Sequence, residues 1–124
     1  MGTITKNILI IDDEKALANA LQIKLTSSGF DTQVAYEGQT ALEFLKKGGF
    51  DLVLLDIMMP NVNGYDVLKY LKESDVHIPV IVCSNLGEDK DLEKAKQLGA
   101  SDFFIKSETP LIVIVNKINE LLKA

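Results

Sequence analysis

Short apolar runs alternate along this chain with longer stretches in which apolar residues recur at helical spacing. The short runs read NILII, DLVLL, IPVIVC and DFFI, and they begin at residues 7, 51, 78 and 102. In the stretch EKALANALQIKLTSSG, Leu17, Leu21 and Leu25 recur every fourth residue, which is typical of a helix with one buried face. Gly29 follows as a stop signal. The rhythm predicts strands that alternate with helices.

The remaining segments continue this alternation. DTQVAY, residues 31–36, is more polar and predicts a short strand near an edge of the sheet. In the last segment, Thr109 and Pro110 are a typical cap and first-turn residue of a helix. Its five apolar residues 111–115 exceed what one helix face buries, so part of this helix is a candidate partner contact, although LIVIV alone also fits a strand. Helices after the first are predicted at residues 38–49, 64–74, 87–100 and 109–124.

Five strands that alternate with five helices predict an α/β fold with one parallel sheet, because parallel strands need crossover connections and these are right-handed. The central runs are apolar throughout, as expected for strands covered on both faces. We therefore predict a flavodoxin-like (βα)5 three-layer sandwich with strand order 2-1-3-4-5. The five units take up residues 1–124 without a repeat or linker, so we expect a single domain and no output domain.

Polar side chains end four of the predicted strands. The first run is followed by Asp12 and Asp13, the third by Asp56, the fourth by Ser84 and the fifth by Lys106. In an open parallel sheet, ligands bind beyond the carboxyl ends of the strands, near the point where strand order reverses. The predicted order makes strands 1, 3, 4 and 5 neighbours. Three carboxylates, a hydroxyl group and an ammonium group are therefore expected at one rim.

These groups together have a specific chemistry. Neighbouring carboxylates repel one another and raise their pKa values unless a cation is present. Mg²⁺ suits oxygen ligands and is usually held by one or two carboxylates and a phosphate oxygen. A carboxylate there also acts as a nucleophile and forms an acyl phosphate, whose oxygens Ser84 and Lys106 would bind. Singly, each residue is equally well explained as a helix cap, a turn residue or a solvated charge, so the prediction depends on their combination.

The composition narrows the classes of function. With 47% hydrophobic and 25% charged residues, the 124-residue chain is typical of a globular domain. No apolar run approaches the roughly 20 residues that span a bilayer, and residues 1–7 lack the features of a signal peptide. We therefore expect a cytoplasmic protein without membrane insertion, and the single Cys83 fits this expectation. The net charge of −5 argues against direct binding of nucleic acid.

The motifs resemble the receiver domain of two-component response regulators over the whole chain. ILIIDDE is similar to the family's acidic pair, DLVLLDIMMPNVNGYDVL to its phosphoacceptor strand and loop, IPVIVCS to its hydroxyl-bearing strand and GASDFFIK to its lysine strand. The resemblance implies that Asp56 accepts the phosphoryl group. It also implies that Asp13 binds Mg²⁺ directly, with Asp12 assisting through water. The backbone carbonyl of Met58 would be a further metal ligand.

The resemblance further implies a switch. Ser84 binds the phosphoryl group, Lys106 pairs with it, and Phe103 takes the place of the family's switch aromatic. A phosphoryl group adds about −1.5 to −2 charge and strong acceptors, so it draws Ser84 inward. Phe103 then rotates into the space that opens and changes the surface formed by the fourth helix, fifth strand and fifth helix. Such a domain is a phosphoacceptor switch and not an enzyme, and it acts as a monomer or a phosphorylation-dependent dimer.

The partners follow from the same resemblance. A histidine kinase or histidine phosphotransfer protein supplies the phosphoryl group, and a downstream target protein binds the changed surface. Met58 and Leu86 lie two residues after Asp56 and Ser84, where family members control how water reaches the acyl phosphate. Neither side chain can orient a water molecule. We therefore expect a long-lived phosphorylated state.

Two positions depart from the family pattern. Ser107 follows Lys106 where the family usually has Pro, commonly after a cis bond. Because a cis bond without Pro costs about 3 kcal/mol, we expect a trans bond and an altered loop. Asn85 stands where the family usually has a small Ala or Gly beside the phosphoryl group. Its side chain either obstructs access or adds a hydrogen bond.

Three alternatives stay open at this point. A hydrolase with an aspartyl-phosphate intermediate needs an acid or base two residues after the nucleophile, where Met58 stands. A flavodoxin-like cofactor binder needs a hydroxyl- and glycine-rich loop after the first strand, where DDEK stands. A pseudo-receiver would serve, unphosphorylated, as a protein-interaction adaptor. Asn85 and Ser107 leave this last alternative open, whereas the polar residues at the strand ends argue against it.

Overall fold

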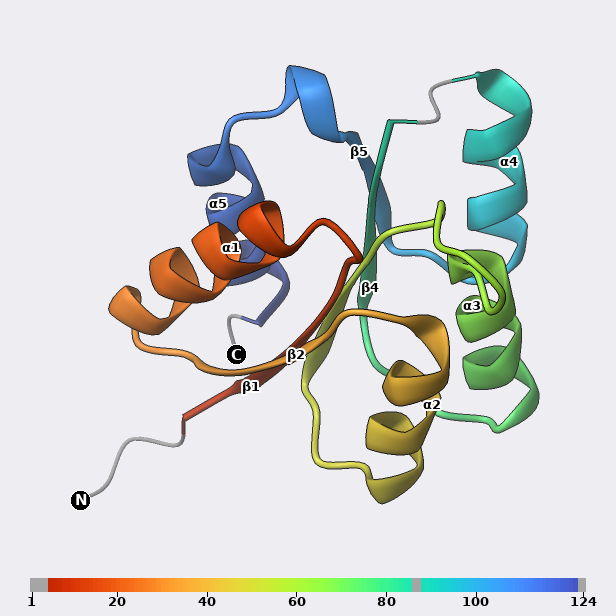
Figure 1. Ribbon diagram of the computed structural model, residues 1–124, viewed down its shortest axis with the longest axis horizontal. Helices are drawn as coiled ribbons and strands as arrows, with labels where there is room; N and C mark the ends of the chain where they lie inside the picture. Colours follow the sequence, from red (N-terminus) through yellow and green to blue (C-terminus); the bar gives the residue numbers. More distant parts are fainter. Residues whose placement is uncertain (1–4, 86–87, 123–124) are drawn as a thin grey trace.

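The computed structural model describes residues 5–85 and 88–122, in which a five-stranded sheet lies between two layers of helices (Figure 1). All strand pairs are parallel, and the order is β2-β1-β3-β4-β5. The predicted flavodoxin-like order is therefore confirmed. In chain order the elements are β1 (Asn7–Ile11), α1 (Lys15–Ser27), β2 (Asp31–Ala35), α2 (Gly38–Lys47), β3 (Leu52–Leu55), α3 (Gly64–Glu73), β4 (Val80–Ser84), α4 (Asp89–Gln97), β5 (Asp102–Ile105), the 3₁₀ turn η1 (Lys106–Glu108) and α5 (Leu111–Leu122).

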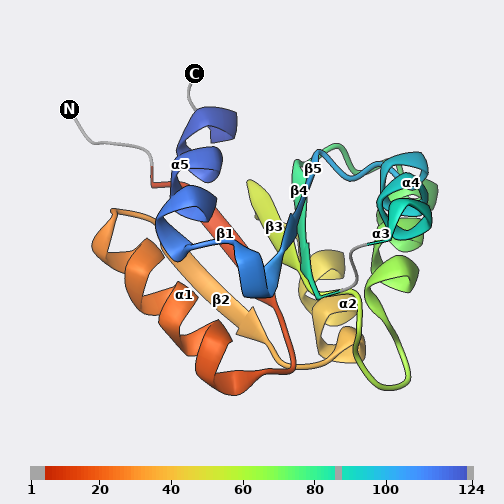
Figure 2. The same cartoon turned by 90° about the horizontal axis from the view of Figure 1, so that it is seen from above.

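The helices divide between the two faces of the sheet. α1 and α5 cover one face, and α2, α3 and α4 cover the other (Figures 1 and 2). In β3, Leu52 and Leu54 pack into the cluster under α1 and α5. Val53 and Leu55 belong to the cluster under the other three helices. β3 is thus apolar at every position because both of its faces are buried, as the sequence predicted.

β2 is an edge strand, and all of its residues except Ala35 are exposed or half-buried, which explains its polar sequence. Residues 111–115 lie in α5 and not in a strand. Ile114 and Val115 are buried there, whereas Ile112 and Val113 are 51% and 41% exposed. The run therefore covers more than one helix face, as predicted. Within the described residues, no helix has both the length and the apolar character needed to cross a bilayer.

The connection between β5 and α5 differs from the prediction. The sequence predicted Thr109 as the cap of the last helix, but α5 begins at Leu111. The Thr109 hydroxyl instead donates a hydrogen bond to the Ile105 carbonyl oxygen at 2.8 Å. The physical reason is the intervening turn η1, which brings Thr109 back over the last carbonyl group of β5. The turn begins at Lys106, directly after β5, so the position of the Lys106 backbone depends on the turn.

The start of α3 packs directly on the backbone that follows β3. A Cβ atom on Gly64 would lie 2.4 Å from the Asp56 carbonyl oxygen and 2.7 Å from the Ile57 Cα atom, so only glycine fits there. The Gly64 N–H donates to the Ile57 carbonyl oxygen at 2.9 Å. Asn63 and Asp66 form a capping box that begins the helix. The loop after Asp56 is therefore fixed from its far end by α3.

Candidate functional site

The carboxyl ends of β1 and β3 bring three carboxylates together. Asp12 and Asp13 follow β1, and Asp56 follows β3, which pairs directly with β1. One carboxylate oxygen from each residue lies within 4.8 Å of the others. Asp12 and Asp56 are each only 3% exposed, whereas Asp13 is exposed. The arrangement expected from the strand ends is therefore present.

Backbone hydrogen bonds that extend the sheet hold the buried pair. The Asp12 N–H donates to the Ala35 carbonyl oxygen at 3.1 Å, and the Asp56 N–H donates to the Ile11 carbonyl oxygen at 2.8 Å. The Asp12 side chain accepts a hydrogen bond from the Glu14 N–H at 2.9 Å. The backbone at Asp12 and Asp56 is thus positioned by the central strands and not by a free loop.

Lys106 reaches this cluster from the end of β5. Its Nζ atom lies 2.9 Å from Asp12 Oδ2, 2.9 Å from Glu14 Oε1 and 3.3 Å from Asp56 Oδ2. The Lys106 side chain is only 6% exposed. The buried Lys106 ammonium group therefore contacts carboxylates that follow two other strands, β1 and β3.

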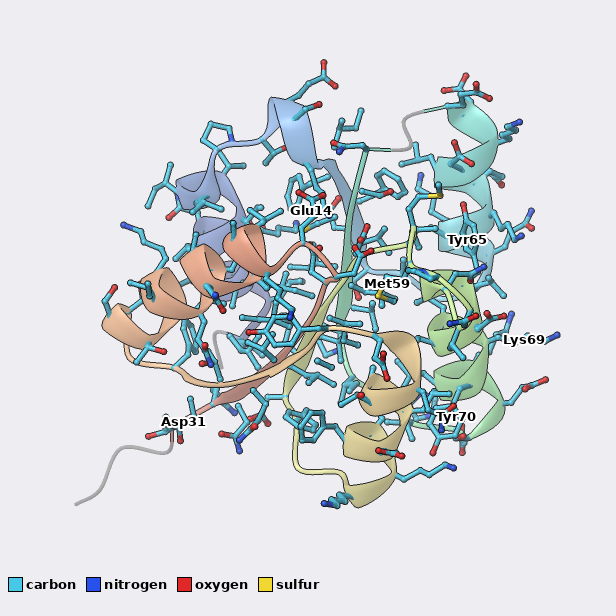
Figure 3. The ribbon with its side chains drawn as sticks, in the orientation of Figure 1. Glu14, Asp31, Met59, Tyr65, Lys69 and Tyr70 are labelled. Atoms are coloured by element: carbon cyan, nitrogen blue, oxygen red, sulfur yellow. The ribbon has the colours of Figure 1, made fainter. Side chains whose placement is uncertain are left out.

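The sequence reasoning did not single out Glu14. In Figure 3, Glu14 lies in the connection between β1 and α1, beside the sheet. The sequence pattern makes Glu14 the first residue of a helical stretch, and in the structure it immediately precedes α1. The available signal was its position directly after Asp12 and Asp13, at the same strand end. An acidic residue there points back over the carboxyl edge of the sheet.

The electrostatics of the cluster are unbalanced. Burial and, after it, the Asp12 charge raise the pKa of Asp56 to about 7, although Lys106 opposes both effects. Burial likewise raises the pKa of Asp12. Burial alone lowers the pKa of Lys106, but hydrogen bonds to Glu14 and Asp12, together with the nearby carboxylate charges, outweigh it and raise the pKa. The site holds more negative than positive charge.

This donor set fits a hard divalent cation. The side chains of the cluster Asp12, Asp13 and Asp56 offer carboxylate oxygens, and Asp13 is exposed to solvent. Mg²⁺ favours oxygen ligands and retains several waters. A cation bound there would also relieve the repulsion that raises the pKa values of the buried carboxylates. Met58 follows in the next loop, with its side chain 62% exposed, and the role of its carbonyl group stays a prediction.

Ser84 and Phe103 occupy the two neighbouring strands. Ser84 ends β4, is fully buried and pairs in register with Ile105, the residue before Lys106. Phe103 lies in β5, is half-buried and packs against the core cluster that α2, α3 and α4 cover. The hydroxyl group is thus on the strand between the Asp56 strand and the Lys106 strand. The switch role of Phe103 stays a prediction.

The two positions that depart from the family pattern contact each other. The Ser107 N–H donates a hydrogen bond to Asn85 Oδ1 at 3.1 Å. No peptide bond between described residues is cis, so the Lys106–Ser107 bond is trans, as predicted. The Asn85 side chain therefore has a hydrogen-bond partner in the loop after Lys106, and its effect on the phosphoryl group stays a prediction. Leu86 lies outside the described residues, so its predicted role stays a prediction.

Comparison with known proteins places the chain in a family. The model of the response regulator receiver domain matches residues 8–118. The chain belongs to the receiver domains of response regulators. This receiver has the same fold as the Francisella response regulator 1452 receiver domain, with a TM-score of 0.89, 28% identity and coverage of 94% of this chain and 96% of that one. The family is that of phosphoacceptor switches in two-component systems.

Two curated relatives are, by name, a transcriptional regulatory protein and a DNA-binding response regulator. The receiver is 36% identical over 99 residues to the transcriptional regulatory protein DltR of Streptococcus agalactiae, which covers 80% of this chain and 44% of that protein. It is 36% identical over 110 residues to the DNA-binding response regulator MtrA of Mycobacterium tuberculosis, which covers 89% of this chain and 48% of that protein. The chain thus spans about half the length of these relatives.

Proposed function

We propose that this receiver is a phosphorylation-controlled switch in which Asp56 accepts a phosphoryl group from a histidine kinase or a histidine phosphotransfer protein. The observation that carries the proposal is the geometry around Asp56. Its carboxylate is buried at the end of a central strand, with Lys106 Nζ 3.3 Å from Oδ2 and Ser84 ending the adjacent strand. A buried nucleophile with a cation and a hydroxyl group on neighbouring strands is suited to phosphoryl transfer.

In the transfer, an Asp56 oxygen forms a bond to phosphorus while the bond from phosphorus to the donor's imidazole nitrogen breaks. The imidazole leaves with the electron pair and takes up a proton. Lys106 pairs with a phosphoryl oxygen, and the Ser84 hydroxyl donates a hydrogen bond to another. Asp13, Asp56 and the Met58 carbonyl group would hold Mg²⁺, with Asp12 assisting, and the bound cation would neutralise charge on the phosphoryl oxygens.

The readout is a change of surface and not a further reaction. A new hydrogen bond to Ser84 exists only in the phosphorylated state, so it shifts the balance between two conformations. Phe103 follows inward, and the surface of α4, β5 and α5 changes for a downstream target protein. Ile112 and Val113, exposed on α5, offer apolar contact area there. Apart from its own phosphorylation and slow dephosphorylation, the domain catalyses nothing.

The cellular setting is part of the same proposal. We place the receiver in the cytoplasm, as a monomer or a phosphorylation-dependent dimer. MtrA is a DNA-binding protein by name. For this receiver we propose no direct nucleic-acid contact, because its net charge of −5 would oppose the phosphate backbone. The expectation that it acts without an output domain stays a prediction.

Intact mass spectrometry after incubation with acetyl phosphate tests the proposal. The wild type is compared with Asp56→Asn and with Asp31→Asn, each in Mg²⁺ and in EDTA. Asp31 is an exposed carboxylate at the start of β2, away from the site (Figure 3). We expect one phosphoryl increment in Mg²⁺ on the wild type and Asp31→Asn, and none on Asp56→Asn. A folded wild type that binds Mg²⁺ without gaining mass would overturn the proposal and favour the adaptor.

A further inference from the structure

The residues that follow Ser84 and Lys106 join the ends of β4 and β5. β4 and β5 pair in parallel, and Ser84 is in register with Ile105. Asn85 therefore begins the loop after β4 just where Lys106 begins the turn η1 after β5. The Ser107 N–H donates to Asn85 Oδ1 at 3.1 Å, across 22 residues of sequence. The proposed phosphoryl ligands thus belong to loops that are bonded to each other.

The donor in this bond, the Ser107 N–H, is near the start of a helical turn, where N–H groups have no acceptor within the turn. The first N–H groups of a helix have no partner within the helix, so they are satisfied by water or by a side chain. Ser107 is the second residue of η1, and Asn85 supplies an acceptor from another strand. Both residues are exposed, so a single neutral hydrogen bond adds little to global stability. Its effect is on where η1 lies.

Lys106 is the first residue of η1 and depends on this placement. Its Nζ atom already makes three close contacts, to Asp12, Glu14 and Asp56. A small displacement of the turn would move the ammonium group away from Asp56. Displacements of about 1 Å in a reacting arrangement have large effects on rate.

The bond requires both residues that depart from the family pattern. Proline at position 107 would have no N–H to donate. Alanine or glycine at position 85 would have no side-chain acceptor. The two departures from the family pattern thus make one contact with each other.

We propose that Asn85 is a positioning residue for phosphoryl transfer: by accepting the Ser107 N–H, it holds η1 so that Lys106 stays in reach of Asp56 and its phosphoryl group. The inference rests on the proposed function. It assigns Asn85 a role through Lys106 and not through contact with the phosphoryl group. The same hydrogen bond joins the loop that follows Ser84 to the turn that contains Lys106, so the positions of these two residues are fixed relative to each other.

The test compares the effect of Asn85→Ala in three backgrounds: the wild type, Ser107→Ala, which keeps the N–H, and Ser107→Pro, which lacks it. The readout is the initial rate of phosphorylation by acetyl phosphate in saturating Mg²⁺. We expect Asn85→Ala to lower the rate about fivefold, the scale of one neutral hydrogen bond, in the first two backgrounds. In Ser107→Pro we expect no effect. Proline also restricts Lys106, but this restriction is common to both proteins compared in that background.

Two further measurements separate positioning from general damage. The Ser107 amide signal in ¹H–¹⁵N spectra should shift in Asn85→Ala, and the Mg²⁺ affinity from calorimetry should stay within about twofold. An equal rate loss in Ser107→Pro would show that Asn85 acts directly at the phosphoryl group and would overturn the inference. A faster reaction in Asn85→Ala would also overturn it and identify Asn85 as an obstruction. A wild type that gains no phosphoryl group would overturn the proposed function itself, whatever the Ser107 signal does.

Discussion

Lys106 Nζ lies 2.9 Å from Glu14 Oε1, closer than its 3.3 Å distance to Asp56 Oδ2. The Glu14 side chain is 56% exposed, whereas the Lys106 side chain is only 6% exposed. Glu14 is thus a competitor of Asp56 for the only ammonium group that these carboxylates share within the described residues. In the phosphoryl transfer that we propose, Lys106 would turn from Glu14 toward the incoming oxygens.

Replacing Glu14 with Gln should therefore speed phosphorylation. The neutral side chain releases Lys106 and removes a negative charge that repels the donor. An ion pair with one exposed partner is worth up to about 1 kcal/mol, so we expect a rate increase of about two- to fivefold with acetyl phosphate. Glu43→Gln, an exposed position on α2 with the same change in net charge, is the control. A slower reaction in Glu14→Gln alone would show that Glu14 assists transfer.

The raised pKa of Asp56 predicts a specific pH dependence of stability without Mg²⁺. The folded protein holds this proton up to about pH 7, whereas the unfolded chain releases it near pH 3.8, the ordinary pKa of an aspartate side chain. The folded state therefore binds more protons between these values, and its free energy of unfolding falls as pH rises through them. The Asp56→Asn variant has no ionisable group at this position, so its free energy of unfolding does not fall with pH for this reason. In EDTA, its stability advantage should grow by on the order of 2–4 kcal/mol from pH 4 to pH 8.

Urea unfolding followed by circular dichroism at both pH values measures this difference. Added Mg²⁺ supplies the matched control, because a bound cation restores the charge balance of the ionised carboxylates. At pH 8 it should stabilise the wild type more than Asp56→Asn. A stability difference between the two proteins that stays constant with pH would show that Asp56 ionises normally in the folded state.

The strand ends could be predicted because they follow from periodicity and topology alone. Apolar runs locate the strands, the parallel order makes the ends of four strands neighbours, and Asp12, Asp56 and Lys106 then meet at one edge. The contact between Asn85 and Ser107 could not be predicted in this way. It joins two loops outside any repeating pattern, and it depends on the turn η1, which the sequence did not reveal. Glu14 was missed because a residue next to a helix is readily explained as part of that helix.

The packing of Gly64 on the Asp56 backbone predicts a steric effect on the site. In Gly64→Ala the new methyl group would meet backbone atoms that cannot move without shifting Asp56. We expect a loss of about 1–3 kcal/mol in stability and a lower phosphorylation rate. Gly29→Ala is the matched control, because its φ is +97° but no atom lies within 4 Å of the new Cβ. That variant should lose about 1 kcal/mol and keep its rate. Urea unfolding and acetyl phosphate kinetics measure both, and equal rates would show that the loop adapts.

From the apolar side chain of Met58 we predict a long lifetime for the phosphorylated state. It is exposed two residues after Asp56, and a thioether cannot orient a water molecule for attack on the acyl phosphate. An amide at this position can accept and donate hydrogen bonds, so Met58→Asn should shorten the lifetime several-fold. The decay of the phosphorylated mass after removal of acetyl phosphate measures it. Met58→Leu, which changes the side chain without adding a polar group, should decay like the wild type. If Met58→Leu and Met58→Asn accelerate decay equally, then Met58 protects the acyl phosphate by shape and not by lacking a polar group.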